Sequence, residues 1–351
     1  MLNRNSQTPL YIQLANLLRE QINTGAIKVG DKLPSETEMI KEYKLGRLTV
    51  RDALSILTNE GLLEKQHGRG TFCKACVNAA KYKIDVLLDL TDMYFAPHYL
   101  RAICDTLEAE DVNIVLHDTK DDSSVICATL ERIASEGSNG ILLQPDSAVG
   151  QASDGLVHVL KSLTENNIPY IMIDSAYENI PPSYAIVNEE NTGVIAANYF
   201  RSLGHKNLAM IALEGHADST LRQKGFCATL DAPPHVLCYS SDLLQSLKDL
   251  LQTHTDITGI FCYNDIIAKE CYKALSKLSI RIPEDVSIVS VDDTVIASTL
   301  TPSLTSVVHP KERLAKSAAE AILSIISGKA DWPFIKVFEP SLNIRKSCKS
   351  L

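Results

Sequence analysis

The stretch from residue 33 to residue 71 constrains the fold of this chain more than any other segment. It holds two short helical patterns and then a hairpin pattern with glycines at its tip. In the second helical pattern, apolar residues recur at the i, i+3, i+4 and i+7 spacing of one buried helix face, namely Val50, Ala53, Leu54 and Leu57. Arg47 and Arg51 share a different face with Leu48. A helix that buries one side and presents two arginines, after a second helix and a short turn, has the geometry that enters a DNA major groove.

Local signals divide this stretch into its elements. Ser35 precedes two glutamates and can accept a backbone hydrogen bond as the N-cap of the first helix. Gly46 separates the two helices, and Gly61 ends the second. The segment 62–72 predicts a hairpin whose glycine tip lets Arg69 approach a phosphate or the minor groove. A solvated basic helix face in an unrelated domain is the alternative interpretation, and the flanking segments argue against it.

Those flanking segments resemble a known family. PLYIQLANLLREQINTGAIKVGDKLPSE, RLTVRDAL and EGLLEKQHGRGTF are similar to the winged-helix DNA-binding domain of GntR-type regulators, and the resemblance covers residues 1–72. It implies that the recognition helix and the wing tip contact DNA. The residues expected to do so are Ser35, Arg47, Thr49, Arg51, Gly68, Arg69 and Gly70. Many relatives carry an arginine just after the Pro-Ser-Glu segment, where this chain has Thr37, so we expect its site preference to differ.

The distribution of charge fits a DNA-binding head on an acidic body. The chain has 351 residues, which is enough for two or three folding units, and its formal net charge is -9. Residues 1–75 hold 11 Lys and Arg against 8 Asp and Glu, or +3, whereas the remainder holds 23 against 35, or -12. An acidic body limits non-specific DNA affinity while leaving the head free to engage phosphate.

Cysteine usage and hydropathy indicate the compartment. The nine cysteines are scattered, and Cys73 and Cys76 form a lone CxxC that no second pair completes as a zinc site, so we expect reduced thiols and no metal. The N-terminus lacks a basic-then-apolar signal pattern, and no apolar run approaches the roughly 18 residues of a membrane helix. We therefore expect a cytoplasmic protein without a membrane segment and without a cofactor.

After an expected linker over 73–82, short apolar runs alternate with helical patterns. The runs are Ile84–Leu88, Ile114–Leu116, Ile141–Leu143, Tyr170–Ile173, Leu208–Leu213, Gly259–Cys262 and Val286–Val291. Short runs without polar alternation suit strands buried on both faces, which is typical of parallel α/β sheets. The pattern is too long for one small sheet and divides near 187–192. We predict two doubly wound lobes over 83–347 with a cleft between them.

Polar residues follow these predicted strands, where ligands of such sheets bind. The set comprises Asp89, Asp174, Asn264 and Asp292, with Arg222 in a helical segment after the fifth run. Carboxylates and an amide can share hydrogen bonds with sugar hydroxyls, and Arg222 donates several in a fixed fork. Nearby aromatic side chains could supply apolar surface, namely Tyr94, Phe95 and Tyr99. We expect Asp265 to be a helix N-cap instead, and for Asp293 a turn role and ligand contact stay equally open.

The body also resembles a known family, over residues 82–347. GILLQPD, NNIPYIMIDSAY, FRSLGHKNLAMIA, LRQKGF, GIFCYNDIIA, RIPEDVSIVSVDD and TPSLTSVVHPKERLAKSAAEAIL are similar to the effector domain of LacI-type regulators, whose fold is that of periplasmic sugar-binding proteins. The resemblance implies sugar contacts by Asp89, Asp174, Arg222, Asn264 and Asp292. The combination of head and body, with FCYNDIIA and VFEPSLNIRKS, resembles the AraR group of arabinose repressors. Ser290-Val291 departs from the usual Gly-aromatic pair, which alters the wall beside Asp292.

These resemblances imply a sugar-responsive transcriptional repressor. We expect a homodimer on palindromic operator DNA, released by L-arabinose or a related sugar. A different sugar, or activation instead of repression, is the alternative within the same class. An enzyme fused to a DNA-binding head is a second possibility, but the chain has no GxxxxGK[ST], GxSxG or HExxH motif. A solute-binding protein for uptake is a third, and the DNA-binding head speaks against it.

Overall fold

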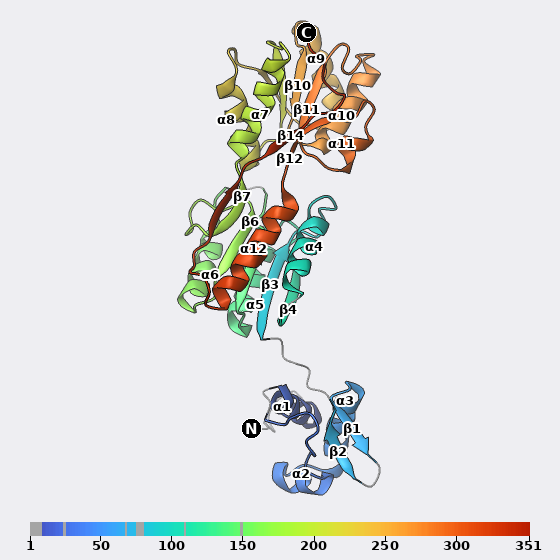
Figure 1. Ribbon diagram of the computed structural model, residues 1–351, viewed down its shortest axis with the longest axis vertical. Coiled ribbons are helices and arrows are strands. Elements are labelled where there is room, and N and C mark those ends of the chain that lie inside the picture. The colour runs from blue at the N-terminus through green and yellow to red at the C-terminus, as the bar shows by residue number, and fades with distance from the viewer. Residues whose placement is uncertain (1–8, 24–25, 67–68, 75–80, 109, 148–149) are drawn as a thin grey trace. The chain divides into compact units, whose positions relative to one another are not determined.

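The structure is a computed structural model that describes residues 9–23, 26–66, 69–74, 81–108, 110–147 and 150–351 (Figure 1). It divides into two compact units, Met1–Lys81 and Tyr82–Leu351. Gly68 of the expected wing tip and Cys76 of the CxxC pair lie outside the described residues.

The first unit is a winged helix-turn-helix, as the sequence predicts. Its elements are α1 (Leu10–Asn23), α2 (Glu36–Tyr43), α3 (Arg47–Asn59), β1 (Leu63–Gln66) and β2 (Gly70–Cys73). The two strands pair antiparallel, and the helices share a core that contains all four apolar residues predicted on α3. Ser35 is the N-cap of α2, as predicted, because its hydroxyl accepts from the backbone N–H of Glu38 at 3.3 Å. The Glu38 carboxylate in turn accepts from the Ser35 N–H at 2.7 Å.

The second unit begins at Tyr82, the last residue of the expected linker, and β2 ends at Cys73, the first. One of its lobes is an all-parallel six-stranded sheet in the order β13-β7-β6-β5-β3-β4. The strands are β3 (Tyr82–Leu88), β4 (Val112–Asp118), β5 (Gly140–Leu143), β6 (Tyr170–Asp174), β7 (Tyr184–Val187) and β13 (Ile335–Phe338). Helices α4 (Ala96–Leu107) and α12 (Lys311–Ile326) pack with one apolar core, and α5 (Ser123–Glu136) and α6 (Asp154–Glu165) with another.

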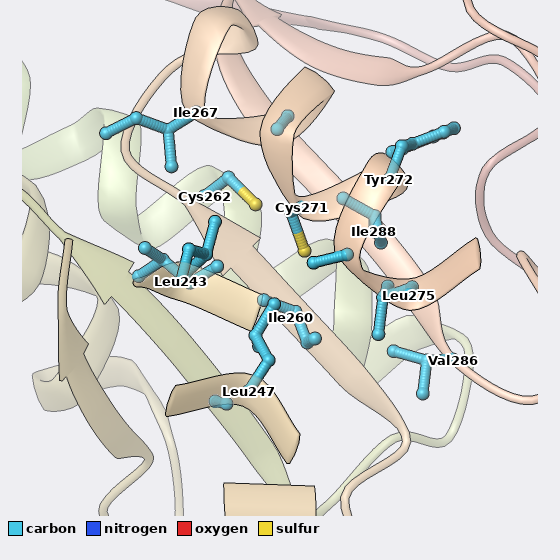
Figure 2. Close-up of a cluster of buried hydrophobic side chains, with 14 of the residues drawn as sticks. Leu243, Leu247, Ile260, Cys262, Ile267, Cys271, Tyr272, Leu275, Val286 and Ile288 are labelled. Atoms are coloured by element: carbon cyan, nitrogen blue, oxygen red, sulfur yellow. The ribbon is translucent and has the colours of Figure 1, made fainter. Parts of the chain in front are cut away.

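The other lobe is a six-stranded sheet in the order β14-β12-β11-β10-β8-β9, in which only β14 runs antiparallel to its neighbour. The strands are β8 (Leu208–Ala212), β9 (His235–Cys238), β10 (Gly259–Cys262), β11 (Ser287–Asp292), β12 (Thr305–Val308) and β14 (Ser341–Asn343). The helices are α7 (Glu189–Ser202), α8 (Ala217–Thr229), α9 (Leu243–Thr253), α10 (Asp265–Lys277) and α11 (Val295–Thr299). Figure 2 shows the apolar core in which Leu243 and Leu247 of α9 and Leu275 of α10 surround Ile260 of β10.

Every apolar run named in the sequence became a strand, and β8, β10 and β11 are buried along their whole length. The chain passes between the two sheets after β7, again between β12 and α12, and a third time between β13 and β14. The first passage falls at residue 188, inside the expected 187–192 division. The second passage brings α12 and β13 to the first lobe and the third takes the chain back to the second lobe at β14, neither of which the apolar pattern indicates.

Two glycines let α7 and α8 approach each other closely. A Cβ added to Gly225 would lie 1.8 Å from the backbone oxygen of Glu190, and one added to Gly193 would lie 2.0 Å from the backbone oxygen of Arg222. Only a residue without a Cβ fits at either position. This contact brings Arg222 of α8 beside the first turn of α7. Within the described ranges, no helix has both the length and the apolar character needed to cross a membrane.

Candidate functional site

A cavity of about 480 Å³ lies in the second unit, lined by residues of both lobes. This size is within the range of about 300–1,000 Å³ that is usual for small-molecule sites. All seven residues expected to contact an effector line it: Asp89, Tyr94, Phe95, Asp174, Arg222, Asn264 and Asp292. Asp89, Asp174, Asn264 and Asp292 converge because they stand at or just after strand ends, and the carboxyl ends of parallel strands meet at one edge of each sheet. Tyr99, by contrast, is fully buried in the core of the first lobe and is not part of the lining.

Asp174 ends β6 and faces a histidine from the passage between β12 and α12. The Nε2 atom of His309 lies 2.8 Å from Oδ1 of Asp174. Burial alone would raise the pKa of Asp174, but attraction by His309, with help from Arg222, holds the pKa below its ordinary value. His309 is 4% exposed and lines the cavity, and neither of its ring nitrogens has a partner with full hydrogen-bond geometry among the described residues, so its contact with Asp174 is an ion-pair contact. It stands 135 residues from Asp174 in the chain, so no local pattern links the two.

Arg222 is bound tightly inside the second lobe. Its Nε and Nη2 atoms donate to the two carboxylate oxygens of Glu189 at 2.7 and 3.0 Å, and Nη1 donates to the backbone oxygen of Tyr263 at 2.9 Å. Burial lowers the pKa of the guanidinium, but Glu189 and Asp218 outweigh it and the pKa is raised. Burial raises the pKa of Glu189, and Arg222 reverses that shift. Both partners are therefore ionised, and Glu189 is a cavity residue that the sequence did not suggest.

Asp292 differs from the other carboxylates of the cavity. It is 5% exposed, and Oδ1 of its carboxylate lies 4.0 Å from Nη2 of Arg222. Burial, together with repulsion from Asp265, raises the pKa of Asp292 to about 7 despite the attraction of Arg222 and Lys311. The Nζ atom of Lys311 donates to the backbone oxygen of Asp292 and lies 4.6 Å from the centroid of the Phe95 ring. Lys311, at the start of α12, thus connects the end of β11 in one lobe to the Phe95 side chain of the other lobe.

The expected N-cap role of Asp265 is wrong. Asn264 is the N-cap of α10, and its side-chain oxygen accepts from the N–H of Ile267 at 2.9 Å. Asp265 is fully buried and accepts from Ser306 Oγ at 2.8 Å and from the N–H of Thr294 at 2.7 Å, so it fixes the loop after β11. Ser290, where the chain departs from the usual pattern, also donates to Asp265.

The open question about Asp293 has a structural answer. Its carboxylate lies 2.6 Å from Nη1 of Arg345 and accepts from Asn343, and it is not among the residues that line the cavity. The backbone at Asp293 has φ +48, a value that turn residues adopt. Asp293 therefore joins the turn after β11 to Asn343 of β14 and to Arg345 just after that strand.

In the winged-helix unit, the expected DNA contacts fall into two groups. Arg47 and Arg51 are exposed on α3, with side chains 78% and 59% accessible, and Arg69 is exposed beside the hairpin tip. Ser35 and Thr49 are less available to contact DNA, because the Ser35 hydroxyl caps α2 and Thr49 is half-buried. Gly70 has φ +120, a conformation that favours glycine.

One acidic residue, Glu36 in the first turn of α2, lies among the basic side chains of this unit. Its carboxylate is 3.7 Å from Nε of Arg47, 3.8 Å from Nε of Arg51 and 3.6 Å from Nζ of Lys65. These distances describe loose, solvent-screened pairs that a phosphate can replace at little cost. In the sequence, Glu36 looks like an ordinary acidic residue of a first helical turn, beside the N-cap Ser35.

Two families match separate parts of the chain. Residues 10–73 match the family described as bacterial regulatory proteins, gntR family, and residues 197–348 match a periplasmic binding protein-like domain. The first match spans the winged-helix unit from α1 to the end of β2. The second spans most of the second lobe together with α12 and β13.

Two arabinose metabolism transcriptional repressors are similar over nearly the whole chain. That of Halalkalibacterium halodurans is 26% identical and covers 95% of this chain and 96% of its own length. That of Geobacillus stearothermophilus is 27% identical and covers 98% of each. One solved structure with the same fold is a periplasmic binding protein/LacI transcriptional regulator from Alkaliphilus metalliredigens, complexed with D-xylulofuranose. Its TM-score is 0.63 and its sequence identity 23%, and the match covers 77% of this chain and 100% of that one.

The winged helix-turn-helix, the two parallel-sheet lobes and the two family matches thus agree along the chain. The chain thus joins a segment that matches the gntR family of bacterial regulatory proteins to a segment that matches a periplasmic binding protein-like domain, and it is similar over nearly its whole length to two transcriptional repressors.

Proposed function

We propose that the protein is a sugar-responsive repressor that leaves its operator when L-arabinose or a closely related sugar fills the cavity. The observation that supports this most is the convergence of seven side chains, from separate strand ends and helices of both lobes, around one cavity of sugar size. The names of the two full-length relatives point to arabinose, and a structural neighbour holds another five-carbon sugar.

The cavity chemistry suits a polyol. Sugar hydroxyls can donate to the carboxylates of Asp89, Asp174 and Asp292, while the amide of Asn264 can both donate and accept. The ring of Phe95 offers an apolar face for the C–H side of a sugar. Because Asp89 and Asp174 belong to one lobe and Asn264 and Asp292 to the other, one ligand can contact both.

A ligand that contacts both lobes favours the arrangement in which they are closest, and it shifts the population toward that state. An effector that bound the open and closed states equally would change nothing. We propose that the protein works as a homodimer, so that closure of the lobes changes the spacing of two DNA-binding units. Arg47 and Arg51 of each subunit would then read half-sites about one helical turn apart on palindromic double-stranded DNA.

The test combines operator selection with sugar release. Duplexes that the full-length protein retains are selected from a random library, and the best one is labelled for fluorescence anisotropy. L-Arabinose is expected to lower the affinity for this duplex, and a panel of other pentoses and hexoses to lower it less. Binding with the same affinity in the presence of every sugar of the panel would refute the proposal. Activation of a reporter promoter, instead of repression, would favour the alternative regulatory mode.

A fused enzyme remains testable in the same samples. Incubating the protein with each sugar that raises its melting temperature, and searching for a new product, addresses that alternative directly. Ligand binding to the folded state alone raises the apparent stability, so the same panel identifies the effector.

A further inference from the structure

We infer that the cavity accepts uncharged and positively charged sugars and rejects sugar acids and sugar phosphates. This inference rests on the proposed function, because it names the charge class of the effector at the same site. It follows from the balance of charges in the cavity wall and from what each charged side chain already contacts.

The described wall of the cavity is strongly acidic. Eight carboxylate side chains line it: Asp89, Asp92, Asp121, Asp146, Asp174, Glu189, Asp218 and Asp292. Two basic side chains, Arg222 and His309, stand against them among the described lining residues. Burial, with repulsion from Asp174 and Asp89, raises the pKa of Asp92, although backbone N–H groups at the start of α4 oppose the shift. The carboxylates therefore already repel one another before any ligand enters.

Both basic side chains are already paired with carboxylates of the wall. Arg222 uses Nε and Nη2 for Glu189 and Nη1 for the Tyr263 carbonyl, and its Nη2 atom also lies 3.5 Å from Asp218. Three of the five guanidinium N–H groups are thus used, and Nη2 also faces Asp292 at 4.0 Å, so a ligand carboxylate or phosphate at the remaining N–H groups would meet these carboxylates. His309 has its Nε2 atom 2.8 Å from Oδ1 of Asp174, so it too already lies against a carboxylate.

The acceptors that remain open match hydroxyl or ammonium donors. Among the described residues, Oδ1 of Asp89 accepts from Thr91, and Oδ1 of Asp92 accepts from the N–H groups of Tyr94 and Phe95. Oδ2 of both aspartates is therefore left for a ligand. A hydroxyl supplies one donor and an ammonium three. A carboxylate or phosphate supplies acceptors and a further negative charge, and like charges brought together without a counter-ion weaken binding by factors of roughly 100 or more.

The test is isothermal titration of the full-length protein with sugars matched in shape and different in charge. The hexose set is D-galactose, D-galacturonate and D-galactosamine, because the ring hydroxyls of D-galactopyranose repeat the configuration of L-arabinopyranose. The pentose set is L-arabinose, 4-amino-4-deoxy-L-arabinose and L-arabinopyranose 1-phosphate, all of which can hold the pyranose ring. In the set that binds, the anionic sugar is expected to bind at least about 100-fold more weakly than the neutral one. The amino sugar is expected to bind at least as tightly as the neutral one.

The possible failures are distinguishable. An anionic sugar that binds within about threefold of its neutral partner overturns this inference and leaves the proposed function standing. If no sugar of either set binds, the proposed function falls and the inference falls with it.

A pair of variants tests whether the wall charge is the cause. Asp92→Asn removes one negative charge and keeps the side-chain oxygen that accepts from the N–H groups of Tyr94 and Phe95, so the turn before α4 keeps these hydrogen bonds. Its matched control is Asp105→Asn, which removes the same charge from the exposed face of α4 outside the cavity. The ratio of anionic to neutral dissociation constants should fall in Asp92→Asn and stay unchanged in Asp105→Asn. An unchanged ratio in both variants would overturn the electrostatic explanation.

Discussion

Replacing Arg222 with Met should destabilise the second unit strongly, because it leaves buried carboxylates without their cation. The guanidinium is 3% exposed and binds both oxygens of Glu189, with Asp218 at 3.5 Å and Asp292 at 4.0 Å. Removing one partner of a buried ion pair costs about 3–5 kcal/mol, since the remaining charge stays in a low-dielectric interior. For a domain of this size, each kcal/mol lowers the melting temperature by roughly 2–4 °C, so we expect a loss of about 6–20 °C.

The same two helices supply a matched control. Lys224 of α8 pairs with Glu190 of α7 at 2.8 Å, but the lysine side chain is 64% exposed. Exposed pairs of this kind contribute only about 0.2–1 kcal/mol. Lys224→Met therefore removes the same charge between the same helices and should lower the melting temperature by a few degrees at most.

The assay is urea and thermal unfolding of the full-length variants, followed by far-ultraviolet circular dichroism. Adding Glu189→Gln to Arg222→Met should recover much of the lost stability, because the uncompensated carboxylate is gone. Below its melting temperature, Arg222→Met should still bind operator DNA and fail to respond to sugar. Equal destabilisation by Arg222→Met and Lys224→Met would refute the argument that burial of the pair sets its importance.

Three further predictions concern other parts of the molecule. Gly225→Ala should lower the melting temperature severely, because the new Cβ would lie 1.8 Å from a backbone oxygen of α7. Gly155→Ala on α6 is the control, because its new Cβ meets only a sulfur atom at 3.5 Å and the variant should be as stable as wild type or more stable. Thermal unfolding of both variants tests this. Arg51→Ala should weaken operator binding by about 1–3 kcal/mol in anisotropy titrations, and unchanged affinity would remove the residue from the DNA contacts. The pKa of Asp292 is raised to about 7, above an unfolded value near 4, so its ionisation costs stability as the pH rises through that window. The melting temperature of Asp292→Asn minus that of the wild type should therefore increase from pH 5 to pH 7 and stay constant above pH 7. A difference that does not change with pH would contradict the raised pKa.

Local patterns in the sequence were sufficient to predict much of this molecule. The buried face of α3 and the buried strands depend on side-chain periodicity over a few residues, and the strand-end positions of Asp89, Asp174 and Asn264 follow from where the apolar runs stop. Once the sheets are parallel, those ends must converge, so the cavity wall was predictable in outline. The winged-helix elements are equally local, since a capping residue and two glycines define their ends.

The tertiary structure decided what local patterns do not encode, namely which distant groups become partners. Glu189 looked like an ordinary acidic residue in a first helical turn, and only the close packing of α7 on α8 made it the counter-ion of Arg222. Asp265 lost its expected capping role to Asn264 because the buried hydroxyls of two other strands and the loop after β11 surround it. The fate of a buried charge depends on the local dielectric and on the partners that the fold supplies, and both arise only when segments far apart in sequence pack together.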